Sequence, residues 1–246
     1  AGGELALVLL EGVNYFTGRA LDFARLTRSA HRHGALIGWD LAHAAGNLRL
    51  RLRDWGVDFA VWCSYKYLNS GPGAAAGCFV HERHGKDPAV LRLAGWWGNE
   101  PKKRFRMHLE PEFFARPGAD GWQLSNPSIL AMAPLRASLD IFEEAGMAAL
   151  RAKSVTLTGY LQWLLDRIPG DRFESITPRA PESRGCQLSL RLRRGAKGLA
   201  ARLEARGVVA DFRPPDVLRV APVPLYTRFA DVWEFSDILA RETRAP

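Results

Sequence analysis

Residues 58–73, with the sequence DFAVWCSYKYLNSGPG, decide the fold that we expect for this chain. The run from Asp58 to Cys63 is short, aromatic and β-branched, which is typical of a buried parallel strand. Lys66 follows at the carboxyl end of that run, just before a glycine-rich turn. Open α/β sheets bind their ligands at this end of their strands. Partial desolvation there makes a lysine amine available as a nucleophile toward a carbonyl.

A second strand is predicted at residues 35–40, with the sequence ALIGWD, and it ends in the carboxylate of Asp40. One predicted strand ends in Asp, and the neighbouring strand leads to Lys. Pyridoxal phosphate (PLP) needs two protein groups of this kind. These are a carboxylate for the pyridinium nitrogen and an amine for the Schiff base. We therefore expect Asp40 and Lys66 on opposite sides of one pyridine ring. Taken singly, an aspartate at a strand end is most often a cap, and a lysine there is most often a surface residue.

Six stretches of the chain together resemble kynureninase, a PLP-dependent enzyme of fold type I. They are WDLAHAAGN (39–47), DWGVDFA (54–60), WCSYKYLN (62–69), GW (95–96), SNP (125–127) and RVAPVPLY (219–226). The resemblance covers the chain from about Val13 to Ile238. It implies an α/β fold, with a mostly parallel sheet in a large domain and a small α+β domain after it. We place the partial PLP-binding large domain at residues 1–125, and the linking helices with the C-terminal small domain at residues 126–246.

The resemblance implies roles for four residues around the cofactor. Lys66 matches the Schiff-base lysine, and Asp40 matches the carboxylate that keeps the pyridine nitrogen protonated. Tyr65 matches a tyrosine that bonds the cofactor phosphate and can assist proton transfer. His43 matches a histidine at the cofactor. Without the motif, a tyrosine on a strand usually serves packing and a lone histidine is usually structural.

Four further residues are assigned by the same resemblance. Trp96 and Asn126 match positions that reach the cofactor phosphate across a dimer interface. Ser125 and Asn126 lie where the aromatic ring of the substrate would bind, as in family members that prefer the 3-hydroxylated substrate. Arg219 matches the arginine that binds the α-carboxylate of the substrate, a task that suits the fork of a guanidinium. The simpler interpretations are a core tryptophan, a plain helix cap and a surface arginine.

The implied reaction is hydrolysis of L-kynurenine to anthranilate and L-alanine, or of 3-hydroxy-L-kynurenine to 3-hydroxyanthranilate and L-alanine, in tryptophan degradation and NAD biosynthesis. One alternative is another PLP enzyme of fold type I, such as a desulfurase-like lyase or an aminotransferase. Another is an inactive fragment that needs a partner segment. A desulfurase needs a cysteine on a mobile loop, whereas Cys63, Cys78 and Cys186 all fall in predicted strands.

Composition places the chain among ordinary soluble globular proteins, with 246 residues of which 47% are hydrophobic and 24% are charged. No apolar run approaches the ~20 residues of a membrane span, and the start is no signal peptide. We therefore expect a cytoplasmic protein with no membrane partner. The net charge of +8 raises the question of nucleic acid, but the basic residues are spread along the chain. A small-molecule substrate is expected instead, and the resemblance adds a homodimer. We expect no metal site, because His31 and His33 are two apart on a predicted helix.

The remaining pattern alternates strands and helices. Strands are expected at residues 5–10, 74–80, 186–190, 208–210 and 217–220, and helices at residues 22–33, 126–142, 147–168, 199–206 and 228–242. The strand at 5–10 is expected to be buried, that at 74–80 central, and that at 186–190 half-exposed. Asn126 is expected to cap its helix. Residues 48–53 alternate like a strand, although the resemblance indicates a turn or short helix there. Residues 83–119 are predicted to form a long functional loop.

The large domain offers only four candidate strands, fewer than the resemblance implies. In the family, an earlier part of the chain supplies the helix start that holds the cofactor phosphate and the aromatic ring that stacks on the pyridine. We therefore expect this chain to be a fragment of a longer protein or to depend on a partner segment, with unpaired outer strands. Glu11 departs from the family pattern of a small or hydroxyl residue. A second carboxylate beside Asp40 would disturb the charge of the site unless it points away.

Overall fold

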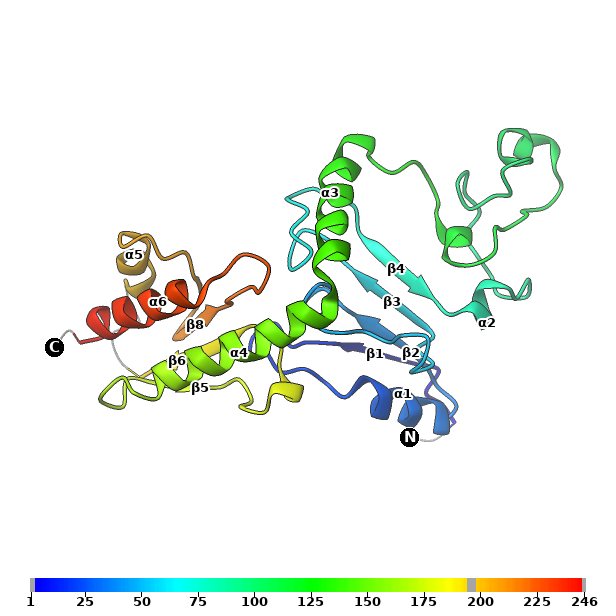
Figure 1. Ribbon diagram of the computed structural model, residues 1–246. Coiled ribbons are helices and arrows are strands. Elements are labelled where there is room, and N and C mark those ends of the chain that lie inside the picture. Colours follow the sequence, from blue (N-terminus) through cyan, green and yellow to red (C-terminus); the bar gives the residue numbers. More distant parts are fainter. Residues whose placement is uncertain (1–2, 194–197, 245–246) are drawn as a thin grey trace. The chain divides into compact units, whose positions relative to one another are not determined.

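The computed structural model describes residues 3–193 and 198–244. The chain divides into two compact units, each with its own sheet (Figure 1). The first unit consists of Ala1–Gly12, Asp22–Ala45 and Leu50–Asp140. The second consists of Val13–Leu21, Gly46–Arg49 and Ile141–Pro246. Two short segments from the first fifty residues therefore belong to the second unit.

The first unit contains a four-stranded sheet in the order β1-β2-β3-β4. Its strands are β1 (Leu7–Glu11), β2 (Leu36–Asp40), β3 (Phe59–Trp62) and β4 (Gly77–Val80). The first three run parallel, whereas β4 pairs antiparallel with β3. The predicted mostly parallel α/β sheet is confirmed. The prediction of a central strand at 74–80 is wrong, because β4 lies at the edge of the sheet that the described residues form.

Helix α1 (Phe23–Arg32) connects β1 to β2 and confirms the predicted helix at 22–33. The Asp22 side chain caps it by accepting a hydrogen bond from the Arg25 N–H at 3.0 Å. Phe23 packs on Trp39 of β2, with ring centroids 4.6 Å apart. Ile37 and Trp39 are completely buried on this side of the sheet. The helix therefore covers one face, as in other βαβ units.

The opposite face of the same sheet is apolar and exposed. Leu7 and Leu36 are register partners and share that face, and they are 44% and 47% exposed. Leu9 is 59% exposed and Val61 45%. Sheets of parallel strands are normally covered on both faces, but the described residues leave these side chains open. The prediction of a buried strand at 5–10 is therefore wrong, because its residues are all exposed or half-buried. The prediction for 58–63 holds only for Asp58 and Ala60, which are buried.

A long irregular segment follows β4, as predicted for residues 83–119. It contains only the short helices α2 (Glu82–Gly85), η1 (Arg104–Leu109) and η2 (Ala119–Trp122). Arginines hold it together through their contacts with aromatic rings. The guanidinium of Arg92 lies 4.2 Å from the ring centroid of Trp122, and that of Arg104 lies 3.9 Å from Trp97.

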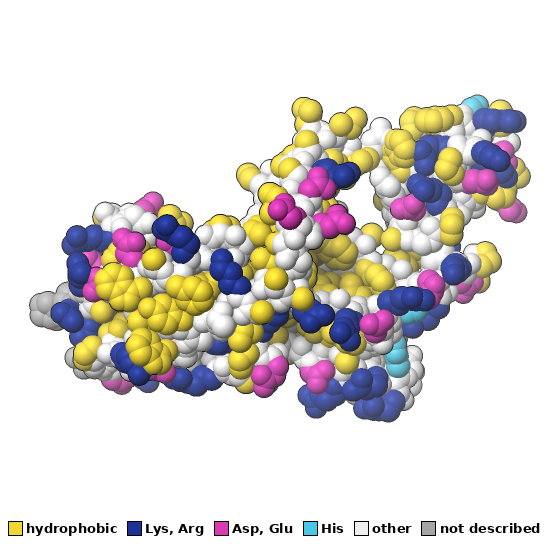
Figure 2. Space-filling model, viewed as in Figure 1, with side chains coloured by type: hydrophobic (Ala, Val, Ile, Leu, Met, Phe, Trp, Pro, Cys, Tyr) yellow, Lys and Arg dark blue, Asp and Glu magenta, His cyan; other side chains and the backbone are white. Residues whose placement is uncertain are grey.

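Helix α3 (Ile129–Ala145) begins later than the sequence predicts. The Ser128 carbonyl accepts a hydrogen bond from the Met132 N–H at 3.2 Å, so Ser128 stands at the start of the helix. The prediction that Asn126 caps this helix is therefore wrong. Apolar side chains are exposed at this end of α3 (Figure 2). Ile129 and Leu130 are 82% and 88% exposed.

The second unit is built on an antiparallel sheet in the order β5-β6-β8-β7. The strands are β5 (Phe173–Ser175), β6 (Leu188–Leu192), β7 (Asp211–Arg213) and β8 (Val217–Val220). The helices are α4 (Met147–Leu165), η3 (Pro181–Ser183), α5 (Leu199–Glu204) and α6 (Phe229–Glu242). Their core includes Leu157, Leu161, Leu188, Leu190, Leu218 and Leu239. The three predicted helices are confirmed, but the strand predicted at 208–210 lies at 211–213 instead.

The other face of the antiparallel sheet is covered by residues 14–18. The Ser189 hydroxyl of β6 donates to the Phe16 carbonyl at 2.6 Å, and the Thr177 hydroxyl donates to the Thr17 carbonyl at 2.6 Å. Gln187 Nε2 donates to the Tyr15 carbonyl at 3.0 Å. These bonds bury the polar side of β6, so the prediction of a half-exposed strand at 186–190 is wrong.

Residues 48–53 form bends and turns, which agrees with the resemblance and overrides the alternating pattern. Basic and acidic side chains are mixed over the face shown in Figure 2. No helix in the described part of the chain is long and apolar enough to cross a membrane.

Candidate active site

The candidate site lies where β2 and β3 end. Asp40 is the last residue of β2 and is the register partner of Val61 in β3. The next residue, Leu41, donates its N–H to the Val61 carbonyl at 2.8 Å. The two parallel strands therefore stay paired to their carboxyl ends, and Lys66 follows in the turn after β3 ends at Trp62.

The Asp40 side chain is exposed and is oriented by its own loop. One carboxylate oxygen, Oδ1, accepts the Ala42 N–H at 2.8 Å. Such a turn fixes the direction of an aspartate side chain at the end of a strand. Glu11 ends β1 and is the register partner of Asp40. The site thus has two neighbouring carboxylates.

Lys66 lies in the turn that follows β3 and is half-buried. Its Nζ lies 5.9 Å from the ring centroid of Tyr65. The turn is held closed by the Ser64 hydroxyl, which donates to the Ala75 carbonyl at 2.5 Å, and by the Ser70 N–H, which donates to the Ser64 carbonyl at 3.2 Å. A lysine on a turn fixed in this way presents its amine from a defined backbone position.

Cys63 follows the last residue of β3 and contacts the loop after β2. Its Sγ lies 4.0 Å from the Ala42 carbonyl, two residues beyond Asp40. A hydrogen bond with Cys63, and then the charge of the thiolate, raise the pKa of the Tyr65 phenol.

His43 and Tyr67 add two rings to this region. Their centroids lie 5.8 Å apart in an edge-to-face arrangement. His43 is half-buried in the turn after β2, and Tyr67 is half-buried in the turn after β3. The packing therefore joins the two loops that carry Asp40 and Lys66. Tyr67 was not singled out from the sequence.

Trp96 and Asn126 come together in another part of the first unit. The Trp96 N–H donates to the Leu124 carbonyl at 2.9 Å, which sets Trp96 beside the segment that carries Ser125 and Asn126. A Cβ at Gly95 would lie 2.5 Å from the Leu124 backbone, so only glycine permits this approach. Trp96 is 48% exposed, and Ser125 and Asn126 are exposed.

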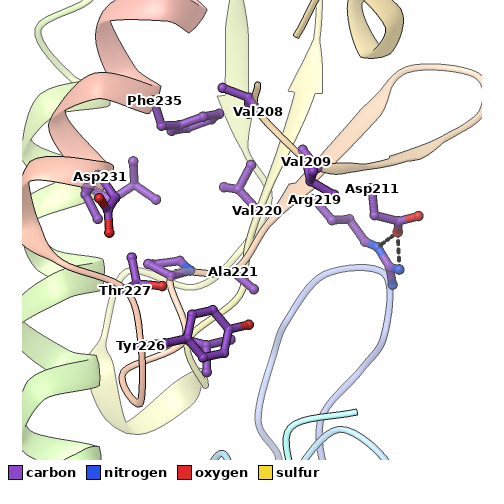
Figure 3. A pocket seen from close by; sticks show the side chains of 15 residues that line it. Val208, Val209, Asp211, Arg219, Val220, Ala221, Tyr226, Thr227, Asp231 and Phe235 are labelled. Carbon is purple, nitrogen blue, oxygen red and sulfur yellow. Dashed lines mark hydrogen bonds and ion pairs between the residues drawn. The ribbon is translucent and has the colours of Figure 1, made fainter. Parts of the chain in front are cut away.

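Arg219 belongs to β8 of the second unit. Its Nε donates to Asp211 Oδ2 at 2.5 Å, and its Nη1 donates to the Tyr15 carbonyl at 2.6 Å. A cavity of about 460 Å³ lies beside it, lined by Val208, Val220, Tyr226, Asp231 and Phe235 among others (Figure 3). In Figure 3, Arg219 and Asp211 point away from Phe235 and Asp231. The arginine is thus held at the rim of the cavity.

The first unit therefore brings Asp40, His43, Tyr65 and Lys66 to two adjacent strand ends. It places Trp96 beside the segment that carries Ser125 and Asn126, and the second unit fixes Arg219. Among the described residues, no group of three or more His, Cys, Asp or Glu side chains could hold a metal ion.

Two family models match different parts of the chain. The model "Aminotransferase class-V" matches residues 3–82, which include the strands that lead to Asp40 and Lys66. The model "Kynureninase C-terminal domain" matches residues 150–239, which include Arg219.

Curated relatives that are named kynureninase match almost the whole chain at 56% identity. The relative from Koribacter versatilis matches over 234 residues, which are 95% of this chain and 55% of the relative. The relative from Myxococcus xanthus matches over 243 residues, which are 99% of this chain and 57% of the relative. By sequence, this chain is similar to kynureninases over nearly its whole length. It spans a little over half the length of the kynureninases that it matches.

Solved structures show which fold this chain shares. A variant of C-DES, with glycine covalently linked to its PLP cofactor, aligns with a TM-score of 0.78 at 19% identity and covers 100% of this chain and 62% of that one. An apo cysteine desulfurase from Thermococcus onnurineus aligns with a TM-score of 0.74 at 15% identity and covers 96% of this chain and 59% of that one. Identities this low establish the fold alone. The predicted fold-type-I architecture is confirmed.

Proposed function

We propose that the protein is a PLP-dependent hydrolase of L-kynurenine or 3-hydroxy-L-kynurenine, which forms L-alanine and anthranilate or 3-hydroxyanthranilate. The observation that carries this proposal is the 56% identity to kynureninases over 95–99% of the chain. The local structure supports it independently. A carboxylate and an amine stand at adjacent parallel strand ends, which is the edge of an α/β sheet where ligands bind.

The residues at the ends of β2 and β3 fit PLP chemically. The Asp40 carboxylate can accept the pyridinium N–H, and the Lys66 amine can bond to the aldehyde carbon. The Ser70 hydroxyl, in the same turn as Lys66, is buried and has no hydrogen-bond partner among the described residues. A buried hydroxyl of this kind calls for a polar ligand or a water molecule.

PLP, when bound, supplies an electron sink for the bonds that break at the substrate. The chain contributes the proton transfers and the orientation. With PLP bound, the Lys66 amine would hold the cofactor, and as a free amine it would accept the α-proton of the substrate. Tyr65, whose ring centroid lies 5.9 Å from the Lys66 Nζ, is the proposed proton donor, and the pKa of its phenol is raised by Cys63. Arg219 binds the α-carboxylate of the substrate through its guanidinium.

The phosphate contacts are proposed to come from Trp96 and Asn126 of a second subunit, with Ser125 and Asn126 near the aromatic ring of the substrate. The exposure of Trp96, Ser125 and Asn126 supports a role at an interface. The exposed apolar end of α3, at Ile129 and Leu130, lies just after this segment and also suits a homodimer.

The proposal places this activity in tryptophan degradation and NAD biosynthesis, and in the cytoplasm. The three cysteines, Cys63, Cys78 and Cys186, are all free thiols. Free thiols are usual where the cellular environment is reducing.

A desulfurase-like activity is the rival proposal, because solved cysteine desulfurases share the fold. Its chemistry needs a reactive thiolate. Cys186 is completely buried, and burial raises its pKa to about 12. Burial and the charge of Asp120 also raise the pKa of Cys78. Neither of these two thiols is suited to attack a substrate sulfur. Cys63 lies at the candidate site, so the choice of kynurenine hydrolysis rests on the 56% identity to kynureninases.

The test combines a PLP titration with product analysis. The visible absorbance of lysine-bound PLP and the fluorescence of anthranilate are measured for the wild type, for Lys66→Ala and for Lys86→Ala. Lys86 is an exposed lysine that pairs with Glu82 at 3.4 Å, so its variant is the matched control. We expect Lys66→Ala alone to lose both signals. Consumption of cysteine in place of kynurenine would establish the rival activity.

A further inference from the structure

Arg219 is held in one orientation by two different partners within the second unit. Asp211 of β7 is its cross-strand register partner. The Nε of Arg219 donates to Asp211 Oδ2 at 2.5 Å, and Nη2 contacts the same oxygen. The Nη1 donates to the Tyr15 carbonyl at 2.6 Å. Only 12% of the Arg219 side chain is exposed.

The Tyr15 carbonyl is itself fixed. Gln187 Nε2 donates to it at 3.0 Å, and Gln187 is only 3% exposed. The next carbonyl, that of Phe16, accepts the Ser189 hydroxyl at 2.6 Å. Two buried side chains of the sheet therefore hold the backbone that bonds Arg219. The arginine is oriented before any ligand arrives.

This arrangement leaves one fork of the guanidinium for a ligand. An arginine has five N–H donors in a planar fork. Asp211 engages the side formed by Nε and Nη2, and Tyr15 takes a donor of Nη1. One donor on Nη1 and one on Nη2 are left over from these bonds. Two such donors form a second fork that fits a carboxylate.

The local charge also favours an anionic ligand. Asp211 Oδ2 accepts a further bond from Arg213 Nε at 2.9 Å. Two guanidinium groups therefore share one carboxylate, and a positive charge remains. Asp211 neutralises part of that charge while it fixes the position of the arginine.

We propose that Asp211 is a positioning residue, which holds Arg219 through its Nε side and so presents the Nη1/Nη2 fork to the α-carboxylate of the substrate. This inference rests on the proposed function, in which Arg219 binds that carboxylate. The competing interpretation is that Asp211 occupies the place of the substrate carboxylate and must leave first. The two interpretations predict opposite effects of removing Asp211.

The test measures binding of L-alanine, the proposed product that carries the α-carboxylate. The Nε–H signals of arginine are followed by NMR while L-alanine is added to the wild type, Asp211→Ala and Asp211→Asn. We expect a saturable shift of the Arg219 signal, with an affinity about tenfold weaker in Asp211→Ala. Asp211→Asn keeps an acceptor for Nε–H and should rescue part of the affinity. Ethylamine, which lacks the carboxylate, should not shift the signal in any variant.

Asp171→Ala is the matched control, because Asp171 also pairs with an arginine of the second unit, Arg193, at 3.0 Å. It should bind L-alanine as the wild type does. The proposal is overturned if L-alanine does not shift the Arg219 signal, or if Asp211→Ala binds it equally well or more tightly. Turnover of L-kynurenine is measured in parallel. If L-alanine binding depends on Asp211 but L-kynurenine is not turned over, the proposed function is wrong and the positioning role stands. If L-kynurenine is turned over normally but L-alanine binding does not depend on Asp211, the positioning role is wrong and the proposed function stands.

Discussion

Glu11 and Asp40 are register partners at the last positions of β1 and β2. Register partners in parallel strands project to the same face, at the strand spacing of about 4.8 Å. Glu11 therefore does not point to the opposite face from Asp40, and the candidate site carries two carboxylates. A protonated pyridine nitrogen would be stabilised by both charges, but only the group in contact with it can accept its hydrogen bond.

The two carboxylates should differ in their effect on PLP. We expect Asp40→Asn to weaken PLP binding at least about tenfold, because a neutral amide stabilises the pyridinium less than a carboxylate does. Glu11→Gln should change the affinity by less than about threefold, since a charge without direct contact is screened by water. Titration of visible absorbance with PLP measures both constants. A larger effect of Glu11→Gln would make Glu11, and not Asp40, the partner of the pyridine nitrogen.

The contact between Cys63 and Tyr65 predicts a change in the titration of the phenol. Cys63 raises the pKa of Tyr65, first through a hydrogen bond and then through its charge. Cys63→Ala should therefore lower the pKa of Tyr65 toward its ordinary value, and phenolate should form at a lower pH. Ultraviolet absorbance against pH measures this, with Tyr65→Phe to identify the signal. Cys78→Ala, at an exposed thiol, is the control. An identical titration in Cys63→Ala and the wild type would contradict the contact.

Local patterns predicted the elements of the fold where one residue fixes a boundary. Asp22 caps α1, and Gly34, with a φ of 75°, ends it. The errors arose where distant contacts decide the structure. The strand at 186–190 looked half-exposed because its polar residues alternate, but Ser189 is buried by bonds to residues 14–18, far away in the sequence. No local pattern contains that information.

The candidate site, too, was predictable only where local sequence patterns decide the structure. Asp40 and Lys66 could be placed at neighbouring strand ends, because strand pattern and parallel pairing suffice for that. The partners of Arg219 could not be predicted, since Asp211 lies in a strand that the sequence places at 208–210 and Tyr15 lies in a loop. The predicted roles of Trp96, Ser125 and Asn126 stay predictions, because they depend on a second subunit.

The uncovered face of the first sheet predicts self-association. Leu9 is 59% exposed there, beside other exposed apolar residues, and such patches drive association. Leu9→Gln should reduce light scattering of the purified chain, and it should change the free energy of unfolding by less than about 0.5 kcal/mol because an exposed side chain loses little burial. Ile37→Gln is the contrasting variant, because Ile37 is completely buried on the opposite face. If Leu9→Gln scattered light as much as the wild type, a different surface would drive self-association.

Asp58 anchors the start of β3 and is only 2% exposed. His31 Nε2 and the Ile37 N–H contact its Oδ2, each at 2.8 Å. His84 Nε2 contacts Oδ1 at 2.7 Å, and Arg83 Nη2 donates to the same oxygen. Burial by itself would raise the pKa of Asp58, but these hydrogen bonds outweigh it and hold the pKa well below its ordinary value of 3.8.

Because the pKa of Asp58 is lowered in the native state, the free energy of unfolding should decrease as the pH falls. The native state binds the Asp58 proton less tightly than the unfolded chain does, so the carboxylate stabilises the fold fully above about pH 4 and progressively less as the pH falls below that value. Asp58→Asn should lower the free energy of unfolding at pH 7 by about 2–3 kcal/mol, because the partners of a buried carboxylate lose its charge. Urea denaturation from pH 7 to pH 3 measures this, and the variant should lose less stability over that range than the wild type. Asp54→Asn, at an exposed aspartate nearby, should behave as the wild type. Equal acid sensitivity of Asp58→Asn and the wild type would show that other carboxylates govern acid unfolding.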